Sequence, residues 1–176
     1  TRAVAAPAAV TITDYQPGGV GWVVERHGRY YCGQLGWPRS FEAMVARDLG
    51  LMMESFDPMQ DGFWLATQAS QWLASVSLVR PRDSAPARLR FFIADDAARG
   101  SGAGNALMQH LMNFCHRRDY RHVYLTTVTG LPAARHLYEK FGFTLTDSHV
   151  DRSWGFEQVE ERFDWRAPSD SPHPQT

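Results

Sequence analysis

The run from Arg99 to Gly104 reads Arg-Gly-Ser-Gly-Ala-Gly, a composition typical of an anion-binding turn. It lies between an apolar stretch, 89–94, and an amphipathic stretch, 103–115. A strand, a glycine-rich turn and a helix in that order present unpaired backbone amides and the positive end of the helix dipole to an anion. Glycine lets the backbone approach the ligand, and arginine adds a charged fork of donors. The spacing therefore predicts a phosphate site.

Two common nucleotide motifs do not fit this run. No Gly-Lys-Ser/Thr follows, so it is not a P-loop, and position 105 is Asn where a G-x-G-x-x-G fingerprint needs glycine. The acidic residue expected about 20 positions on is replaced by the basic and aromatic stretch 117–120. Two other interpretations stay open at this stage, a purely structural strand–helix turn and a nucleotide-binding domain of another type.

A second motif, later in the sequence, helps to choose among these interpretations of the glycine-rich run. The run resembles the R-x-x-G-x-G/A pyrophosphate loop of the GNAT superfamily of N-acetyltransferases, and 123–127 is similar to that family's fifth strand. Residues 133–143 match its A-x-x-L-Y-x-K-x-G-F signature. The stretch 21–42 also resembles the acetyltransferase half of bacterial proteins that fuse it to a MarR-type repressor.

The resemblance implies acetyl-CoA as co-substrate, held where the fourth and fifth strands splay apart, and it implies no metal. Phe92, Ile93 and Ala94 would line the pantetheine arm, and one of their amides would polarise the thioester carbonyl as an oxyanion hole does. The full set of positions carried over for acetyl-CoA is Phe92, Ile93, Ala94, Arg99, Gly100, Ser101, Gly102, Ala103, Gly104, Asn105, Thr127, Ala134, Leu137, Tyr138 and Lys140.

Tyr138 is the predicted general acid, because its phenol could protonate the departing thiolate. A core role with the hydroxyl at the surface is the alternative. Asp95, at the end of the central strand, is the first candidate for the base, and Glu54 and Asp57 are the others; the spacing does not choose among them.

Three positions depart from the family pattern. Leu131 stands where Asn is common, Asp96 where Pro is usual, and Ala103 where Ile or Leu is frequent. These differences concern the fine geometry of the cofactor rather than the existence of the pocket.

Bulk properties favour one domain, 8–166, with flexible ends at 1–7 and 167–176. A net charge of −1 without a basic stripe argues against nucleic acid, and no apolar run reaches the ~20 residues needed to span a bilayer. Cys32 and Cys115 fit no metal or redox spacing, which favours free thiols in the cytoplasm. The histidines without companion ligands at metal-site spacing are His110, His116, His122 and His136.

Hydrophobic periodicity and turn residues predict a mixed α/β fold, with a twisted, mostly antiparallel sheet of about seven strands. Ser40 is the expected N-cap of a helix that ends before 57–58, and the pair 27–28 is an expected turn. The predicted strands are 11–15, 21–25, 63–67, 72–79, 88–94, 123–127, 143–150 and 158–165. The predicted helices begin near residues 41, 103 and 132.

The predicted function is transfer of acetyl from acetyl-CoA to a primary amine of a small molecule or protein, in a ternary complex. A non-catalytic acyl-CoA-binding sensor or partner module is the alternative, and a homodimer is allowed for. Five aromatic residues of the N-terminal half form either ordinary core or an acceptor pocket using cation–π contacts. They are Trp22, Tyr30, Tyr31, Trp37 and Phe41.

Overall fold

A seven-stranded sheet forms the centre of the computed structural model, which describes Ala6 and residues 8–169. The strand order is β1-β2-β3-β4-β5-β7-β6, and every neighbouring pair is antiparallel except β4–β5. The mixed sheet predicted from the sequence is confirmed. The strands are β1 (Thr11–Asp14), β2 (Gly62–Gln68), β3 (Gln71–Val79), β4 (Ala87–Ala94), β5 (His122–Val128), β6 (Thr144–Asp151) and β7 (Gln158–Arg166).

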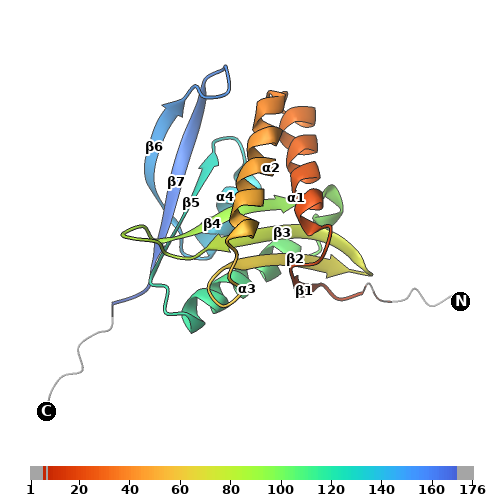
Figure 1. Ribbon diagram of the computed structural model, residues 1–176, viewed down its shortest axis with the longest axis vertical. Coiled ribbons are helices and arrows are strands. Elements are labelled where there is room, and N and C mark those ends of the chain that lie inside the picture. The colour runs from red at the N-terminus through yellow and green to blue at the C-terminus, as the bar shows by residue number, and fades with distance from the viewer. Residues whose placement is uncertain (1–5, 7, 170–176) are drawn as a thin grey trace, which may run out of the picture.

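Helices cover both faces of the sheet (Figure 1). On one face α1 and α2 stand side by side in front of the strands, while α3 and α4 pack behind them. The α-helices are α1 (Gly19–His27), α2 (Arg39–Glu54), α3 (Ala103–Arg117) and α4 (Pro132–Lys140). A π-helical segment, η1 (Gly28–Gln34), continues α1, and a 3-10 turn, η2 (Asp96–Ala98), precedes α3.

The alternation of side chains along β2 shows why both layers are needed. Phe63 and Leu65 pack in the cluster under α1 and α2, whereas Trp64 and Ala66 pack in the cluster under α3. Successive strand residues point to opposite faces, and all four are buried. A central strand that is apolar on both faces requires helices on both sides.

The predicted strand 21–25 is wrong, because these residues belong to α1. Valine and tryptophan favour strands locally, but helical spacing places Val23 and His27 on one buried face. Val23 packs with Leu49 of α2 and Phe63 of β2. Tertiary burial of this helical face outweighs the local preference for a strand.

The predicted turn at 27–28 is also wrong, since the helix passes directly into η1. A Cβ on Gly28 would lie 2.6 Å from Cδ of Glu42, so a larger residue there would displace the end of the Glu42 side chain. Ser40 is not the N-cap: α2 begins at Arg39 with Pro38 in the capping position.

The parallel pair β4–β5 opens soon after it begins. Only Ala87 with Val123 and Arg88 with Tyr124 are paired, although both strands continue for several residues. A bulge in β4, where Phe91 has φ 52°, increases the divergence. The splay between the fourth and fifth strands, expected from the resemblance, is present.

The ends of the chain are only partly described. The expectation of flexible ends falls for residues 1–5, 7 and 170–176 outside the described residues. Just after β7, Ala167 donates its amide to the Arg121 carbonyl at 2.8 Å, and Arg121 Nη2 donates to the Pro168 carbonyl at 2.9 Å. The ordered chain therefore continues slightly past 166. Within the described part, no helix has the length and apolar character of a membrane span.

Candidate functional site

Two cavities flank the opening between β4 and β5. The first, which we call the α3–α4 groove, has a volume of about 380 Å³ and lies against the end of β4, the turn before α3, and the β5–α4 loop. The second, the α2–β7 cavity, has a volume of about 340 Å³ and lies between α2, β4, β5 and β7. Tyr31 and Phe92 line both. These two side chains therefore form a wall that the groove and the cavity share.

The start of α3 has the geometry predicted for an anion site. Gly100 and Gly102 have φ of 73° and 81°, a region that glycine adopts readily. The amides of Gly104 and Asn105 have no hydrogen-bond partner among the described residues. They lie in the first turn of the helix, where backbone N–H groups are available to a ligand. Arg99 is exposed beside them.

A side chain holds the turn together. Ser101 Oγ donates to the Ala98 carbonyl at 2.6 Å and accepts the Ala103 amide at 3.1 Å. Ser101 therefore shapes the loop, while Ala103 is fully buried in the core under α3. Although alanine at position 103 is smaller than the Ile or Leu frequent in the family, the start of α3 is still packed against the core at this residue.

Gly104 is required by a close approach between elements. A Cβ there would lie 3.3 Å from Leu137 Cδ2 and 3.3 Å from Phe92 Cζ. Phe92, Gly104 and Leu137 all line the groove. Bulk at position 104 would press on two side chains of the groove wall.

The predicted acetyl-CoA positions fall into four groups. Gly100, Ser101, Gly102 and Ala103 form the turn and the start of α3 and line neither cavity. Those that line the groove are Phe92, Ile93, Ala94, Arg99, Gly104, Ala134 and Leu137. Thr127 and Tyr138 instead line the α2–β7 cavity. Lys140 Nζ donates to Asn105 Oδ1 at 2.7 Å, a contact that ties α4 to α3 outside the lining of the groove.

Asp95 is committed to structural contacts. Its Oδ1 accepts the Ala97 amide at 2.8 Å, which caps η2, and its Oδ2 lies 2.6 Å from Arg26 Nη1. Asp95 lines the groove and not the α2–β7 cavity. Of the other two candidates, Glu54 lines neither cavity, and Asp57 accepts hydrogen bonds from its own loop at Met59 and Gln60.

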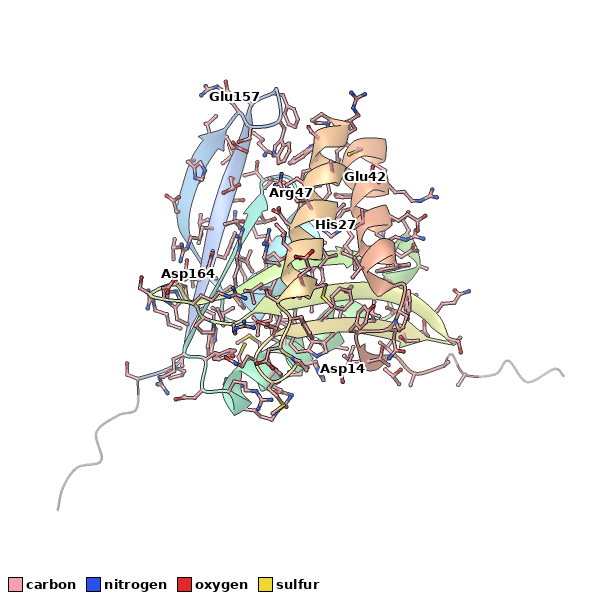
Figure 2. The ribbon with its side chains drawn as sticks, viewed as in Figure 1. Asp14, His27, Glu42, Arg47, Glu157 and Asp164 are labelled. Carbon is pink, nitrogen blue, oxygen red and sulfur yellow. The ribbon has the colours of Figure 1, made fainter. Side chains whose placement is uncertain are left out.

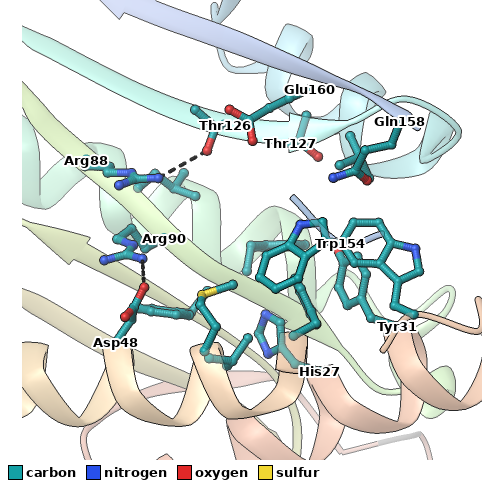
Figure 3. Close-up of a pocket in the computed structure, with 18 of the residues that line it drawn as sticks. His27, Tyr31, Asp48, Arg88, Arg90, Thr126, Thr127, Trp154, Gln158 and Glu160 are labelled. Atoms are coloured by element: carbon teal, nitrogen blue, oxygen red, sulfur yellow. Dashed lines mark hydrogen bonds and ion pairs between the residues drawn. The ribbon is translucent and has the colours of Figure 1, made fainter. Parts of the chain in front are cut away.

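The α2–β7 cavity has a charged end and an aromatic end (Figure 3). Figure 3 shows Arg88 and Arg90 together at one end, and Tyr31 and Trp154 at the other. Figure 2 places the cavity in the molecule: His27 lies on α1, which with α2 faces the β6–β7 hairpin. The tip of that hairpin contributes Trp154.

The aromatic residues singled out in the sequence divide between core and cavity. Tyr31, Trp37 and Phe41 contact one another, with ring centroids 4.5–5.0 Å apart, and all three line the cavity. Trp22 instead packs edge-on against Trp72, far from this lining. The cluster is therefore core on one side and cavity wall on the other.

Tyr138 is only 5% exposed and reaches the cavity from α4. Burial raises the pKa of Tyr138 above its ordinary value, and the nearby Tyr31 raises it further. The same two effects, burial and the neighbouring Tyr30, raise the pKa of Tyr31 to about 12. Both phenols are therefore neutral hydrogen-bond donors at physiological pH.

His27 is a neutral imidazole in the cavity wall. Burial lowers the pKa of His27 to about 4, although its hydrogen bond to the Val23 carbonyl acts in the opposite direction. The 2.8 Å contact assigns the proton to Nδ1, because a carbonyl oxygen can only accept. Nε2 is then an unprotonated acceptor.

Sequence reasoning missed the charged lining. Arg90 Nη2 lies 3.4 Å from Asp48 Oδ2, and Arg88 Nη2 donates to Thr126 Oγ1 at 3.2 Å. Glu160 of β7 also lines the cavity and lies beside Thr126 and Thr127 (Figure 3). One signal was available: two arginines two residues apart in an otherwise apolar central strand share a face.

Comparison with known families matches residues 19–143 to the acetyltransferase (GNAT) family, which is more than half of the chain. The chain belongs to the GNAT acetyltransferase family. The α3–α4 groove and the splayed strands are thus features of a GNAT domain. No curated protein matches the sequence.

Solved GNAT structures share the fold at low sequence identity. A GNAT acetyltransferase from Staphylococcus aureus Mu50 has a TM-score of 0.73 and 16% identity, covering 91% of this chain and 100% of that one. The protein yncA from Salmonella typhimurium, solved with its cofactor acetyl-CoA, has a TM-score of 0.72 and 14% identity over 95% and 99% of the two chains. A ribosomal-protein-alanine N-acetyltransferase from Brucella melitensis has a TM-score of 0.71 and 14% identity over 89% and 99%.

Proposed function

We propose that this GNAT domain transfers the acetyl group of acetyl-CoA to a primary amine, with acetyl-CoA in the α3–α4 groove and the amine in the α2–β7 cavity. The observation that carries the proposal is the meeting of the two cavities at Tyr31 and Phe92, next to Tyr138. Binding both substrates so that they meet at one point makes the transfer effectively unimolecular.

The groove supplies what coenzyme A needs. The free amides of Gly104 and Asn105 and the exposed Arg99 suit its diphosphate. Phe92, Ile93 and Ala94 form the wall for the pantetheine arm, in the part of β4 that no longer pairs with β5. Backbone groups released from strand pairing are free to bind a ligand.

The amine nitrogen attacks the thioester carbonyl carbon, and the carbonyl oxygen takes up the electron pair. When this pair returns, the carbon–sulfur bond breaks and the sulfur leaves as a thiolate. The nitrogen, positively charged after its attack, loses a proton and the thiolate gains one, giving the amide and coenzyme A. Tyr138 donates a hydrogen bond to the departing sulfur. Because a thiol ordinarily has a lower pKa than a phenol, Tyr138 stabilises the thiolate before any proton is transferred.

The amine must lose a proton to attack, and we assign its acceptance to Glu160. Two carboxylates line the cavity, and Asp48 is already bound to Arg90 and Arg47. Glu160 has one weaker neighbour, His149 Nε2 at 3.8 Å. Asp95, one of three candidates named from the sequence, pairs with Arg26 and lines the groove rather than the α2–β7 cavity.

Substitution of Tyr138 by Phe tests the enzymatic role. We expect kcat for thiol release to fall about 10²-fold, with a Kd for acetyl-CoA by calorimetry that changes less than about twofold, because the phenol acts only as sulfur departs. Tyr15→Phe, at an exposed tyrosine of the other end of the molecule, is the matched control. Unchanged turnover in Tyr138→Phe would remove this assignment.

The alternative function, a non-catalytic acyl-CoA-binding module, predicts the same binding without turnover. It would be favoured if acetyl-CoA bound and no amine released thiol. A neutral, buried phenol at the junction of two cavities favours the enzyme, since binding alone does not need it.

Several expectations from the sequence remain proposals. They are the likeness of 21–42 to MarR-linked acetyltransferases, a bacterial and cytoplasmic setting, a homodimer, and independence of metal, nucleic acid and membrane. Among the residues that the structure describes, no three His, Cys, Asp or Glu side chains gather as metal ligands.

A further inference from the structure

Arg88 is a cation without a matching anion. Its Nη2 donates to Thr126 Oγ1, and its guanidinium lies 5.4 Å from the centre of the Tyr124 ring. Neither contact supplies negative charge, and no carboxylate among the described residues pairs with it. Its Nε–H is buried with no hydrogen-bond partner. The side chain is partly buried, and a buried donor left without a partner is costly unless a ligand completes it.

The surroundings of Arg88 strengthen this point. Arg90 lies close enough to Arg88 for the two charges to repel, and burial and this repulsion both lower the pKa of Arg90. Asp48 offsets only Arg90, from which it lies 3.4 Å away. The two arginines share the charged end of the cavity in Figure 3. An anion placed there would neutralise Arg88 and relieve the repulsion between them.

The part of the cavity wall on β7 carries acceptors suited to an amine. Gln158 Oε1 is buried without a hydrogen-bond partner, while its Nε2 donates to Asp151 at 3.1 Å. Gln158 and Glu160 follow one another on the same face of β7, and both line the cavity. In Figure 3 Glu160 lies beside Thr126 and Thr127, and Gln158 lies farther from the arginines, toward Trp154. The cavity thus offers acceptors for N–H groups from β7 and a free guanidinium from β4.

We propose that the acceptor is an amino acid in the broad chemical sense: its amine lies toward Glu160 and Gln158, and its carboxylate binds Arg88. The planar fork of a guanidinium matches a carboxylate with two parallel hydrogen bonds, and because it can bind a phosphate in the same way, the test compares the two anions directly. The apolar part of the acceptor then contacts Trp37, Phe41 and Trp154. This inference rests on the proposed function and narrows the class of its amine.

Matched pairs of amines that differ only in the carboxylate provide the test. The pairs are phenylalanine with phenethylamine and 6-aminohexanoate with hexylamine, and 2-aminoethyl phosphate is compared with β-alanine. Binding to the protein saturated with CoA is measured by calorimetry, and kcat/KM by thiol release from acetyl-CoA. We expect the best carboxylate-bearing amine to exceed its partner about 10²-fold, because a buried donor left unpaired penalises the partner.

Variants of Arg88 show whether that preference comes from this side chain. Arg88→Met should abolish the preference, and Arg88→Lys, which keeps the charge and loses the fork, should retain part of it. Arg117→Met, at an arginine in the last turn of α3 on the far face, should change neither ratio. Thermal unfolding and the Kd for acetyl-CoA verify that each variant is folded. Because Arg88→Lys preserves the charge, it serves as the test if Arg88→Met fails to fold.

The outcomes separate this inference from the proposed function. If alkylamines bind and react as well as their carboxylated partners, or if the preference persists in Arg88→Met, the assignment of Arg88 is wrong while acetyl transfer stands. A preference for the phosphate over β-alanine would also overturn the carboxylate. If no amine releases thiol although Arg88-dependent binding of amino acids is measured, the enzymatic role fails and the carboxylate site stands.

Discussion

The α3–α4 groove and the α2–β7 cavity meet at Tyr31 and Phe92, yet they are built in different ways. The groove takes its lining from β4 and from the loops that begin α3 and α4, and its donors are backbone amides. The cavity takes charged and aromatic side chains from α1, η1, α2, β4, α4 and the β6–β7 hairpin. Backbone donors keep their chemistry when side chains change. The groove can therefore keep one ligand across a family, whereas the cavity can change its acceptor.

The largest expected loss of activity that tests the difference between groove and cavity is at Glu160, which lines only the α2–β7 cavity. Glu160→Gln should lower kcat/KM about 10³-fold at neutral pH, because no carboxylate accepts the amine's proton, and should leave the Kd for acetyl-CoA unchanged. Activity of the variant should rise about tenfold per pH unit below the pKa of the amine, as the amine deprotonates in solution.

Glu157→Gln, at an exposed residue near the hairpin tip (Figure 2), is the control for Glu160. A pH profile of Glu160→Gln parallel to that of the unmodified protein would contradict the role of base.

The next largest effect is on the free energy of unfolding, to which His27 in the cavity wall contributes. The pKa of His27 is about 4 in the folded protein, and its ordinary value, which applies to the unfolded chain, is 6.5. As the pH falls, the unfolded chain therefore takes up the proton before the folded protein does. The free energy of unfolding is therefore fully retained above pH 6.5 and falls as the pH drops toward 4, by about 3 kcal/mol in total. His27→Asn should remove this part of the slope in urea titrations at pH 7, 5.5 and 4.5.

Asp164 offers an internal reference for that measurement. Hydrogen bonds from Arg162, Thr146 and His122 outweigh burial and lower the pKa of Asp164. A carboxylate with a lowered pKa stabilises the fold above its unfolded pKa, near 4, and that contribution is lost only below it. If unmodified protein and His27→Asn had the same slope between pH 6.5 and 4.5, the neutral buried imidazole would be the wrong description.

The smallest effect belongs to the groove. Gly104→Val should weaken acetyl-CoA binding about tenfold, or about 1.4 kcal/mol, because the new methyl groups press on Leu137 and Phe92 and crowd the amides. The preference among amines at saturating acetyl-CoA should not change. Gly50→Ala, where a Cβ meets nothing within 4 Å, is the control, with unchanged binding. A changed amine preference in Gly104→Val would show that the two regions are not separable.

The sequence alone determined the local features of the structure, namely those that depend on residues close together in the chain. The turn 99–104, the helix after it and the strand before it were all predicted, because glycine conformation, helix starts and strand alternation are local properties. The strands 63–67 and 72–79 were predicted for the same reason, and the Ala69–Ser70 turn that joins β2 to β3 has positive φ at both residues. Most of the groove could therefore be predicted, because its residues are close together in the sequence.

Only the tertiary structure decided where remote side chains meet. Residues 21–25 have strand propensity and become helix, because the burial of Val23 against α2 and β2 depends on packing that no short window contains. Likewise, nothing along the chain relates Arg88 to Gln158 and Glu160, which are brought together by the splay of β4 from β5. Asp95 was a reasonable base until Arg26, 69 positions earlier in the chain, was found beside it. Charge pairing and burial depend on the distances between side chains, and the fold sets those distances for residues that are far apart in the sequence.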